Sequence, residues 1–237
     1  MPLPSVRPPP PSLSANSASI RSRFFSVRYC APLKAAGLTV FHVVPTLAGA
    51  LKAIDAGVDG LVVEGGEGGG FKNPNDVALM VLLPLIRSKV DVPIIAAGGL
   101  VCGRSMAAAF ALGAEGIQMG TRMVSAAESP VHANWKNAIL DAKETDTLFL
   151  NRHGPGPALR ALRTERTTKL DREPSDNIMG EMRNALDLYF GGDMEAAIAL
   201  SGQVAGRIDE VKPAKQIIDE VIAEFHDIMG DLAKNYL

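Results

Sequence analysis

The chain has 237 residues, of which 47% are hydrophobic and 21% charged, and its formal net charge is −2. This is the ordinary composition of one globular domain of barrel size, and it contains no sign of a membrane span. The near-balanced charge argues against a nucleic-acid-binding surface. The two cysteines, Cys30 and Cys102, are far apart in the sequence and indicate neither a metal site nor a disulfide framework.

Residues 1–31 do not have the composition of a folded domain. Proline and serine dominate them, and no acidic residue occurs before Asp55. We expect this leader to be extended or disordered, because it has little apolar surface to bury. Its stretch SIRSRFFSVRY resembles an organellar transit peptide, and the alternative is a non-native leader without function. The two alternatives imply an organellar and a cytoplasmic location, respectively.

A repeated strand-turn-helix unit follows from Leu33. The expected strands are LTVFHVV, VDGLVVE, VPIIAA and EGIQM, with apolar helical stretches between them. Thr46 is the expected N-cap of the first complete helix. The strands are rich in β-branched residues and lack polar alternation, which favours parallel strands covered on both faces. We therefore predict an α/β fold over residues 32–125.

Three of these strands end at glycine-bearing turns, at residues 65–70, 98–99 and 120–121. In α/β units, the loops at the carboxyl ends of the strands hold ligands. Clustered glycines let the backbone approach a ligand closely, and a helix N-terminus behind them favours a phosphate. The turns AAGG and QMGT, separated by one helix, fit the phosphate site of a barrel.

Residues 126–237 are expected to form a helical C-terminal region. The sequence indicates two short helices around Gly191 and Gly192 and a longer amphipathic helix after Pro213. Arginine and glutamate are interspersed over residues 160–169, and we interpret this stretch as a solvated helical face.

The segments that carry a family resemblance are EGGEGGG, PIIAAGG and ALGAEGIQMGTR, with ESPVHANWKNAIL and SGQVAGRIDEV further on. In these segments the sequence resembles the nitronate monooxygenase family and its relatives, the FMN-dependent enoyl-acyl-carrier-protein reductases. The resemblance runs from about Leu33 to about Phe225 and implies FMN held in a TIM barrel. The first strand of this chain is similar to the fifth of the family barrel. We therefore expect only the C-terminal four strands of a (β/α)8 barrel, with a C-terminal helical cap. A half barrel has open edges and an uncovered interior, so we expect either a homodimer that closes it or a fragment of a longer protein.

The resemblance also implies which residues contact FMN. They are Glu64, Gly65, Gly69, Gly98, Gly99, Gln118, Met119, Gly120 and Thr121. The phosphate is expected on the backbone amides of the last two glycine turns, with the Thr121 hydroxyl as a further donor. Glu64 replaces a family glutamine that contacts the flavin. A carboxylate there disfavours the anionic reduced ring unless it is neutralised.

No catalytic residue and no metal site are assigned. Phe71 stands where the family carries a histidine, in wording like EAGGH, and a phenyl group cannot exchange a proton. The adjacent Lys72 is interpreted as a solvated charge. His42 remains a candidate for a role near the substrate only if its strand register points it into the barrel mouth; otherwise it is structural.

The leading hypothesis is an FMN-dependent oxidoreductase of nitronate monooxygenase type, which oxidises alkyl nitronates with O2. A nitronate is already a carbanion equivalent, so the missing histidine affects its use less than that of a nitroalkane. The first alternative is an enoyl-thioester reductase that uses NAD(P)H through FMN. The second is a non-catalytic half barrel that binds a phosphate-bearing ligand or nothing. None of these hypotheses involves a nucleic acid or a membrane.

Overall fold

The structure is a computed structural model in which residues 25–236 are described. Most of the leader expected at residues 1–31 therefore lies outside the described residues. Where the two overlap, the structure differs from the expectation, because α1 (Phe25–Ala35) is helical and Cys30 is only 1% exposed. Cys30 packs in the same apolar cluster as Ala50 and Ala53, so this end of the supposed leader belongs to the folded part of the chain.

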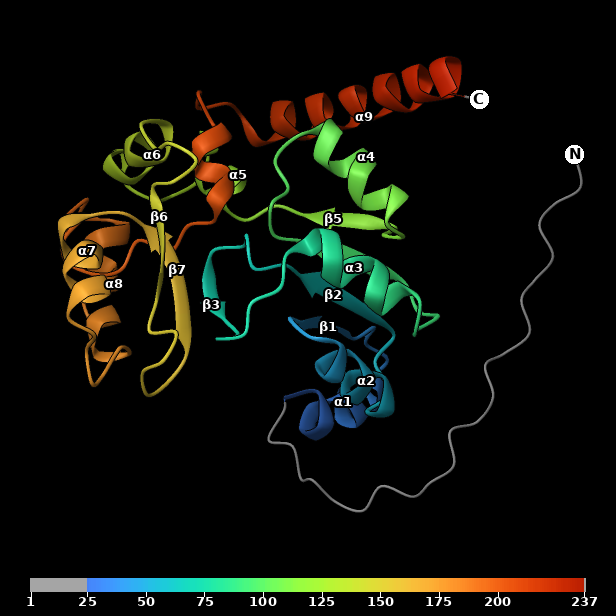
Figure 1. The fold of residues 1–237 in the computed structure, drawn as a ribbon, viewed down its shortest axis with the longest axis horizontal. Helices are drawn as coiled ribbons and strands as arrows, with labels where there is room; N and C mark the ends of the chain where they lie inside the picture. Colours follow the sequence, from blue (N-terminus) through green and yellow to red (C-terminus); the bar gives the residue numbers. More distant parts are fainter. Residues whose placement is uncertain (1–24, 237) are drawn as a thin grey trace, which may run out of the picture.

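Four strands form a parallel sheet, as predicted, with helices between them (Figure 1). The strands, in spatial order, are β1 (Phe41–Val44), β2 (Gly60–Glu64), β4 (Ile94–Ala97) and β5 (Gly116–Gln118). The connecting helices are α2 (Leu47–Asp55), α3 (Leu79–Arg87) and α4 (Gly103–Ala111). The α/β fold is confirmed, whereas the barrel that these strands would complete stays a prediction. The Thr46 hydroxyl accepts a hydrogen bond from Gly49 N at 3.0 Å, which confirms the predicted N-cap of α2.

The two faces of the parallel sheet differ in burial. Val44, Leu61 and Ile94 point to one face and are fully or almost fully buried against the helices. At the β1 edge, Phe41 and Val43 alternate with Val44 and point to the other face, where they are 41% and 46% exposed. The sheet is thus covered on its helix face and open at the β1 end of the opposite face.

The region expected to be helical contains two strands, which is a correction to the prediction. They pair with a short strand from the glycine loop in an antiparallel sheet of the order β3-β7-β6. Its strands are β3 (Gly70–Lys72), β6 (Thr147–Leu150) and β7 (Ala158–Leu162). Every residue of β7 is buried, so this stretch has no solvated stripe that a surface helix would need. It is instead the central strand of its sheet.

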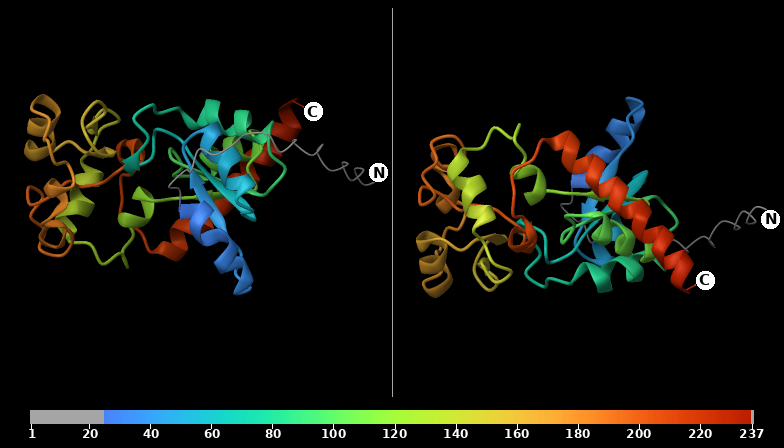
Figure 2. Two further views of the ribbon diagram at one scale, coloured as in Figure 1. Left: turned by 90° about the horizontal axis from the view of Figure 1, so that it is seen from below. Right: turned by 90° about the horizontal axis from the view of Figure 1, so that it is seen from above.

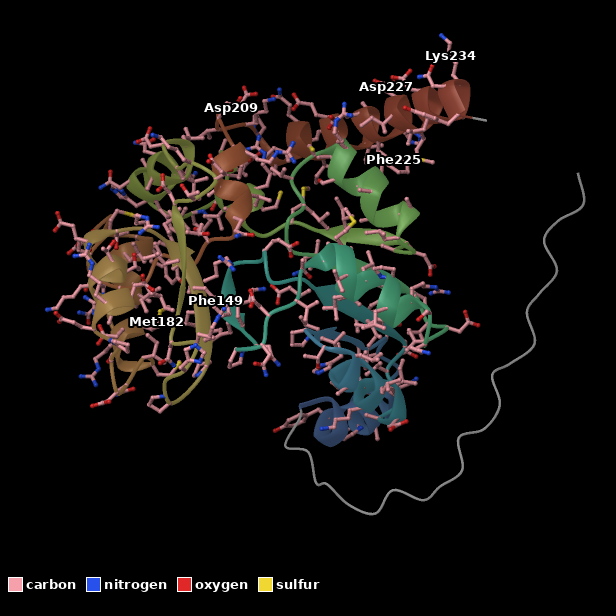
Figure 3. All side chains as sticks on the ribbon, in the orientation of Figure 1. Phe149, Met182, Asp209, Phe225, Asp227 and Lys234 are labelled. Atoms are coloured by element: carbon pink, nitrogen blue, oxygen red, sulfur yellow. The ribbon has the colours of Figure 1, made fainter. Side chains whose placement is uncertain are left out.

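Helices surround this second sheet and then return to the first. They are α5 (Thr121–Val124), α6 (Ala133–Leu140), α7 (Glu165–Arg172), the 3-10 turn η1 (Gly180–Met182), α8 (Ala185–Tyr189) and the 3-10 turn η2 (Gln203–Arg207). The amphipathic helix predicted after Pro213 is confirmed as α9 (Ala214–Tyr236), which runs back over α4 (Figure 2). Phe225 of α9 lies between the two helices (Figure 3), with its ring centroid 5.1 Å from that of Phe110. Within residues 25–236, no helix combines the length and apolarity needed to cross a bilayer.

Candidate ligand-binding site

A cavity of about 210 Å³ lies where the carboxyl ends of β2, β4 and β5 meet the segment at residues 200–204. It brings together most of the expected contact residues, namely Glu64, Gly69, Gly98, Gly99, Gln118, Gly120 and Thr121. Gly65 lies behind this wall and lines a much smaller adjacent cavity. Met119 differs from the expectation, because its side chain packs in the apolar core. Strand alternation explains this difference, since Gln118 takes the cavity side of the sheet.

Two glycine corners supply the backbone of the cavity. Gly98 and Gly99 have φ of 84° and 77°, a conformation that favours glycine. A Cβ atom at Gly98 would lie 2.9 Å from the carbonyl oxygen of Gly65, so the corner packs directly against the glycine loop. Among the backbone hydrogen bonds of the described residues, none is donated by the amides of Gly98, Gly99, Gly120 or Thr121. These amides are therefore available to a ligand that accepts hydrogen bonds.

The Thr121 hydroxyl is oriented by the C-terminal segment. Its side chain is buried, and its Oγ1 accepts a hydrogen bond from Gly202 N at 2.9 Å. A hydroxyl that accepts one hydrogen bond still has its proton to donate. Thr121 can therefore donate to the same ligand as the free amides, as a phosphate oxygen would require.

The helix behind the first corner does not contribute as expected. The first amide of α4, Gly103 N, donates to the Glu224 carboxylate of α9 at 2.6 Å. A carboxylate is attracted to the positive end of a helix, and here the Glu224 carboxylate already complements that end of α4. The corner at Gly98 and Gly99 therefore depends on its own amides.

The glycine loop at residues 65–70 is held from two sides. The Glu67 carboxylate accepts a hydrogen bond from Leu79 N, at 3.0 Å from each oxygen, where α3 begins. The Glu67 carbonyl accepts from Gln203 N at 2.9 Å. A Cβ atom at Gly69 would lie 2.5 Å from the carbonyl carbon of Ser201. These contacts place the segment at residues 200–204 as a wall of the cavity, which the sequence pattern did not predict.

Lys72 is not the solvated charge that the sequence indicated. Its side chain is 3% exposed, and its Nζ lies 2.9 Å from Glu64 Oε1 and donates to the Gly65 carbonyl at 3.0 Å. Burial lowers the pKa of the Lys72 ammonium group below its ordinary value, and the contact with Glu64 opposes that decrease. The pairing of β3 with β7 turns this side chain under the glycine loop, because Lys72 stands opposite the buried Ala158.

Arg160 is the second charged residue that the sequence predicted to be solvent-exposed and that the structure shows to be buried. It lies on β7, is 6% exposed and donates from Nε to the Gly66 carbonyl at 2.8 Å. Burial lowers the pKa of the Arg160 guanidinium group, and Asp76 opposes this effect. Lys72 and Arg160 thus hold the carbonyl groups of two consecutive loop residues.

The candidate His42, and Phe71 at the position of the family histidine, both lie away from the cavity. His42 shares its face of β1 with the buried Val44, so the register turns it toward the helices, and partial burial lowers its pKa. Phe71 is 53% exposed and is not part of the cavity wall. The ionisable side chains in the wall are Glu64 and Glu67. Both are already engaged, the first by Lys72 and the second by the start of α3.

Comparisons with known proteins agree with this geometry. Residues 14–224 match the family described as nitronate monooxygenase. A Rhodococcus jostii protein named (3aS,4S,5R,7aS)-5-hydroxy-7a-methyl-1-oxo-octahydro-1H-indene-4-carboxyl-CoA dehydrogenase is 32% identical, over 82% of this chain and 66% of the relative. A Staphylococcus aureus protein named "Probable nitronate monooxygenase" is 31% identical, over 83% of this chain and 59% of the relative. The solved structure of FabK from Thermotoga maritima shares 38% identity at a TM-score of 0.82, over 89% of this chain and 68% of FabK. The chain thus spans about three fifths to two thirds of the length of these proteins.

Proposed function

The chain belongs to the nitronate monooxygenase family, and from this premise we propose that it is the FMN-binding part of a flavin oxidoreductase that oxidises alkyl nitronates with O2. The observation that carries the proposal is the convergence of unpaired amides from two glycine corners, with the Thr121 hydroxyl, on one cavity. Such an array of donors suits a phosphate group.

The size of the cavity fits the phosphate end of FMN better than the whole cofactor. Pockets that hold an entire small molecule measure roughly 300–1,000 Å³, and this cavity has about 210 Å³. Its buried apolar wall, which includes Leu100 and Val204, excludes water around a ligand. We assign the phosphate and its chain to this cavity, and the walls around the ring to structure beyond it.

Bound FMN would supply the electron transfer, and the residues of this chain would bind and orient it. None of the described cavity-lining side chains is a histidine, and Glu64 and Glu67 are engaged. The wall therefore offers no free base to remove a proton from carbon. Phe71, at the position where the family carries a histidine, supports a substrate that arrives already ionised, such as an alkyl nitronate, over a neutral nitroalkane.

The alternative is an FMN-dependent enoyl-thioester reductase that uses NAD(P)H. One comparison favours a thioester substrate, because the Rhodococcus jostii relative is named as a dehydrogenase of a carboxyl-CoA. Consumption of NADPH with a crotonyl thioester, without consumption of O2 in the presence of propyl-2-nitronate, would select this alternative. The opposite pattern would select the nitronate oxidase.

We further propose that the open face of the parallel sheet is covered in the active protein, either by a second copy or by strands outside this chain. Phe41 and Val43 are exposed there, and apolar side chains on a sheet face ordinarily pack against a partner. Light scattering of the purified chain distinguishes a dimer from a monomer. The proposal places the protein in the cytoplasm, or in an organelle if the leader at residues 1–31 acts as a transit peptide.

The test of FMN binding is uptake of the cofactor by the purified chain. We expect a yellow protein that retains flavin absorbance after dialysis, or a colourless protein that gains it when FMN is added. Gly120→Val should lower the affinity, because nothing lies within 4 Å of a Cβ atom there and the new side chain would project into free space at the cavity wall. Gly230→Val on α9 is the matched control, since its Cβ position is equally open but is not part of the cavity wall. A colourless protein that takes up no FMN would contradict the proposal.

A further inference from the structure

A buried ion pair lies immediately behind the cavity wall. Glu64 belongs to the wall, with its side chain 21% exposed, whereas Lys72 lies behind it with 3% exposure. The Lys72 ammonium group contacts both the Glu64 carboxylate and the Gly65 carbonyl. Lys72 can therefore influence a ligand only through the residues that it holds.

Nearly every charged side chain around Lys72 makes a short contact with another group. Glu64 on β2, Glu67 in the loop, Arg160 on β7 and Asp76 before α3 are the charged groups that face Lys72. Arg160 lies 3.7 Å from Asp76, and Glu67 caps α3. Among residues 25–236, Lys72 is the cation in direct contact with Glu64, so its charge is the one that neutralises that carboxylate.

An anionic ligand makes this neutralisation important. The wall contains two carboxylates, and a phosphate-bearing ligand adds further negative charge to a partly dehydrated cavity. An unpaired carboxylate at the end of β2 would repel such a ligand. The same lysine also fixes the Gly65 carbonyl, which touches the corner at Gly98.

We propose that Lys72 is a positioning residue of the cavity, which holds the Glu64 carboxylate neutralised and in place so that the wall accepts an anionic flavin phosphate. The inference rests on the proposed FMN binding. It adds that one lysine allows the cavity wall to contain a carboxylate beside an anionic ligand. Neither the family resemblance nor the cavity itself identifies this residue.

The test is a double-mutant cycle with Lys72→Met, Glu64→Gln and the double variant, measured by FMN titration. Removing one partner of a buried pair leaves an unpaired charge, whereas removing both does not. We expect Lys72→Met to weaken FMN binding by about tenfold or more, and the double variant to return to within a few fold of the unaltered protein. Lys72→Arg should retain part of the affinity. Lys89→Met, which removes an exposed lysine, is the matched control.

Recovery of FMN binding in the double variant separates this role from a purely structural one. A Lys72→Met protein that is only misfolded would bind FMN weakly and would not recover when Glu64 is also replaced.

Thermal unfolding of the FMN-free variants separates failure of this inference from failure of the proposed function. If the unaltered chain binds no FMN but the unfolding midpoints show that Lys72 and Glu64 are coupled, the proposed function fails and the positioning of Glu64 by Lys72 stands. If Lys72→Met binds FMN as tightly as the unaltered chain does, or if Glu64→Gln does not restore its binding, the inference is overturned while the proposed function stands.

Discussion

The two sheets contribute to the cavity in different ways. The parallel sheet supplies it with backbone, through the corners at Gly98 and Gly120 that follow β4 and β5. The antiparallel sheet supplies buried cations, Lys72 and Arg160, that hold the glycine loop from behind. Backbone donors depend on local conformation, whereas the burial of a cation depends on strands that pair across the chain. The first sheet therefore determines what the cavity can bind, and the second determines how the loop is held.

The substitution with the largest expected effect disrupts the backbone corner that the parallel sheet contributes to the cavity. Gly98→Ala places a side chain at φ 84° and a Cβ atom 2.9 Å from the Gly65 carbonyl oxygen. We expect a loss of about 2–3 kcal/mol in the free energy of unfolding, with loss of FMN uptake. Denaturant unfolding and FMN titration measure the two effects. Unchanged stability would mean that the corner does not pack against the glycine loop as described.

The substitution with the next largest expected effect removes a buried cation that the antiparallel sheet contributes. Arg160→Met places an apolar side chain in β7 and removes the donor to the Gly66 carbonyl and one of the two arginines that pair with Asp76. We expect a loss of about 1–3 kcal/mol in the free energy of unfolding, with weaker FMN binding. Arg152→Met is the matched control, because Arg152 also pairs with Asp76 but its side chain is 44% exposed. Equal effects of the two substitutions would show that burial of Arg160 does not matter.

The smallest effect tests the placement of His42 on the helix side of the parallel sheet. Its pKa is lowered by burial, so the unfolded chain binds the proton first as the pH falls below about 6.5. The stability that depends on neutral His42 is complete above this pH and is lost as the pH falls through the folded-state pKa. We expect His42→Gln to lose less stability than the unaltered chain in that window, by under about 1 kcal/mol. Denaturant unfolding at several pH values measures this difference, and identical pH profiles would contradict it.

The same contrast explains what could be predicted from the sequence. The parallel strands and their glycine corners were predicted because each is encoded within a few consecutive residues, as in VPIIAAGG. The strands β6 and β7 were missed because their short apolar runs fit a buried helix equally well, and only pairing with β3 decides between the two. The burial of Lys72 follows from that pairing, so no local pattern could have revealed it. His42 failed as a candidate for a different reason, since a register of one residue decides which face it occupies.

The wall formed by residues 200–204 also has a consequence for biosynthesis. The Gly202 amide orients Thr121, and the Gln203 amide holds the Glu67 carbonyl. During translation, these two donor residues emerge from the ribosome well after the parallel strands. We therefore expect FMN to bind only late in synthesis. Chains stalled before Ser201 should remain colourless even in excess cofactor.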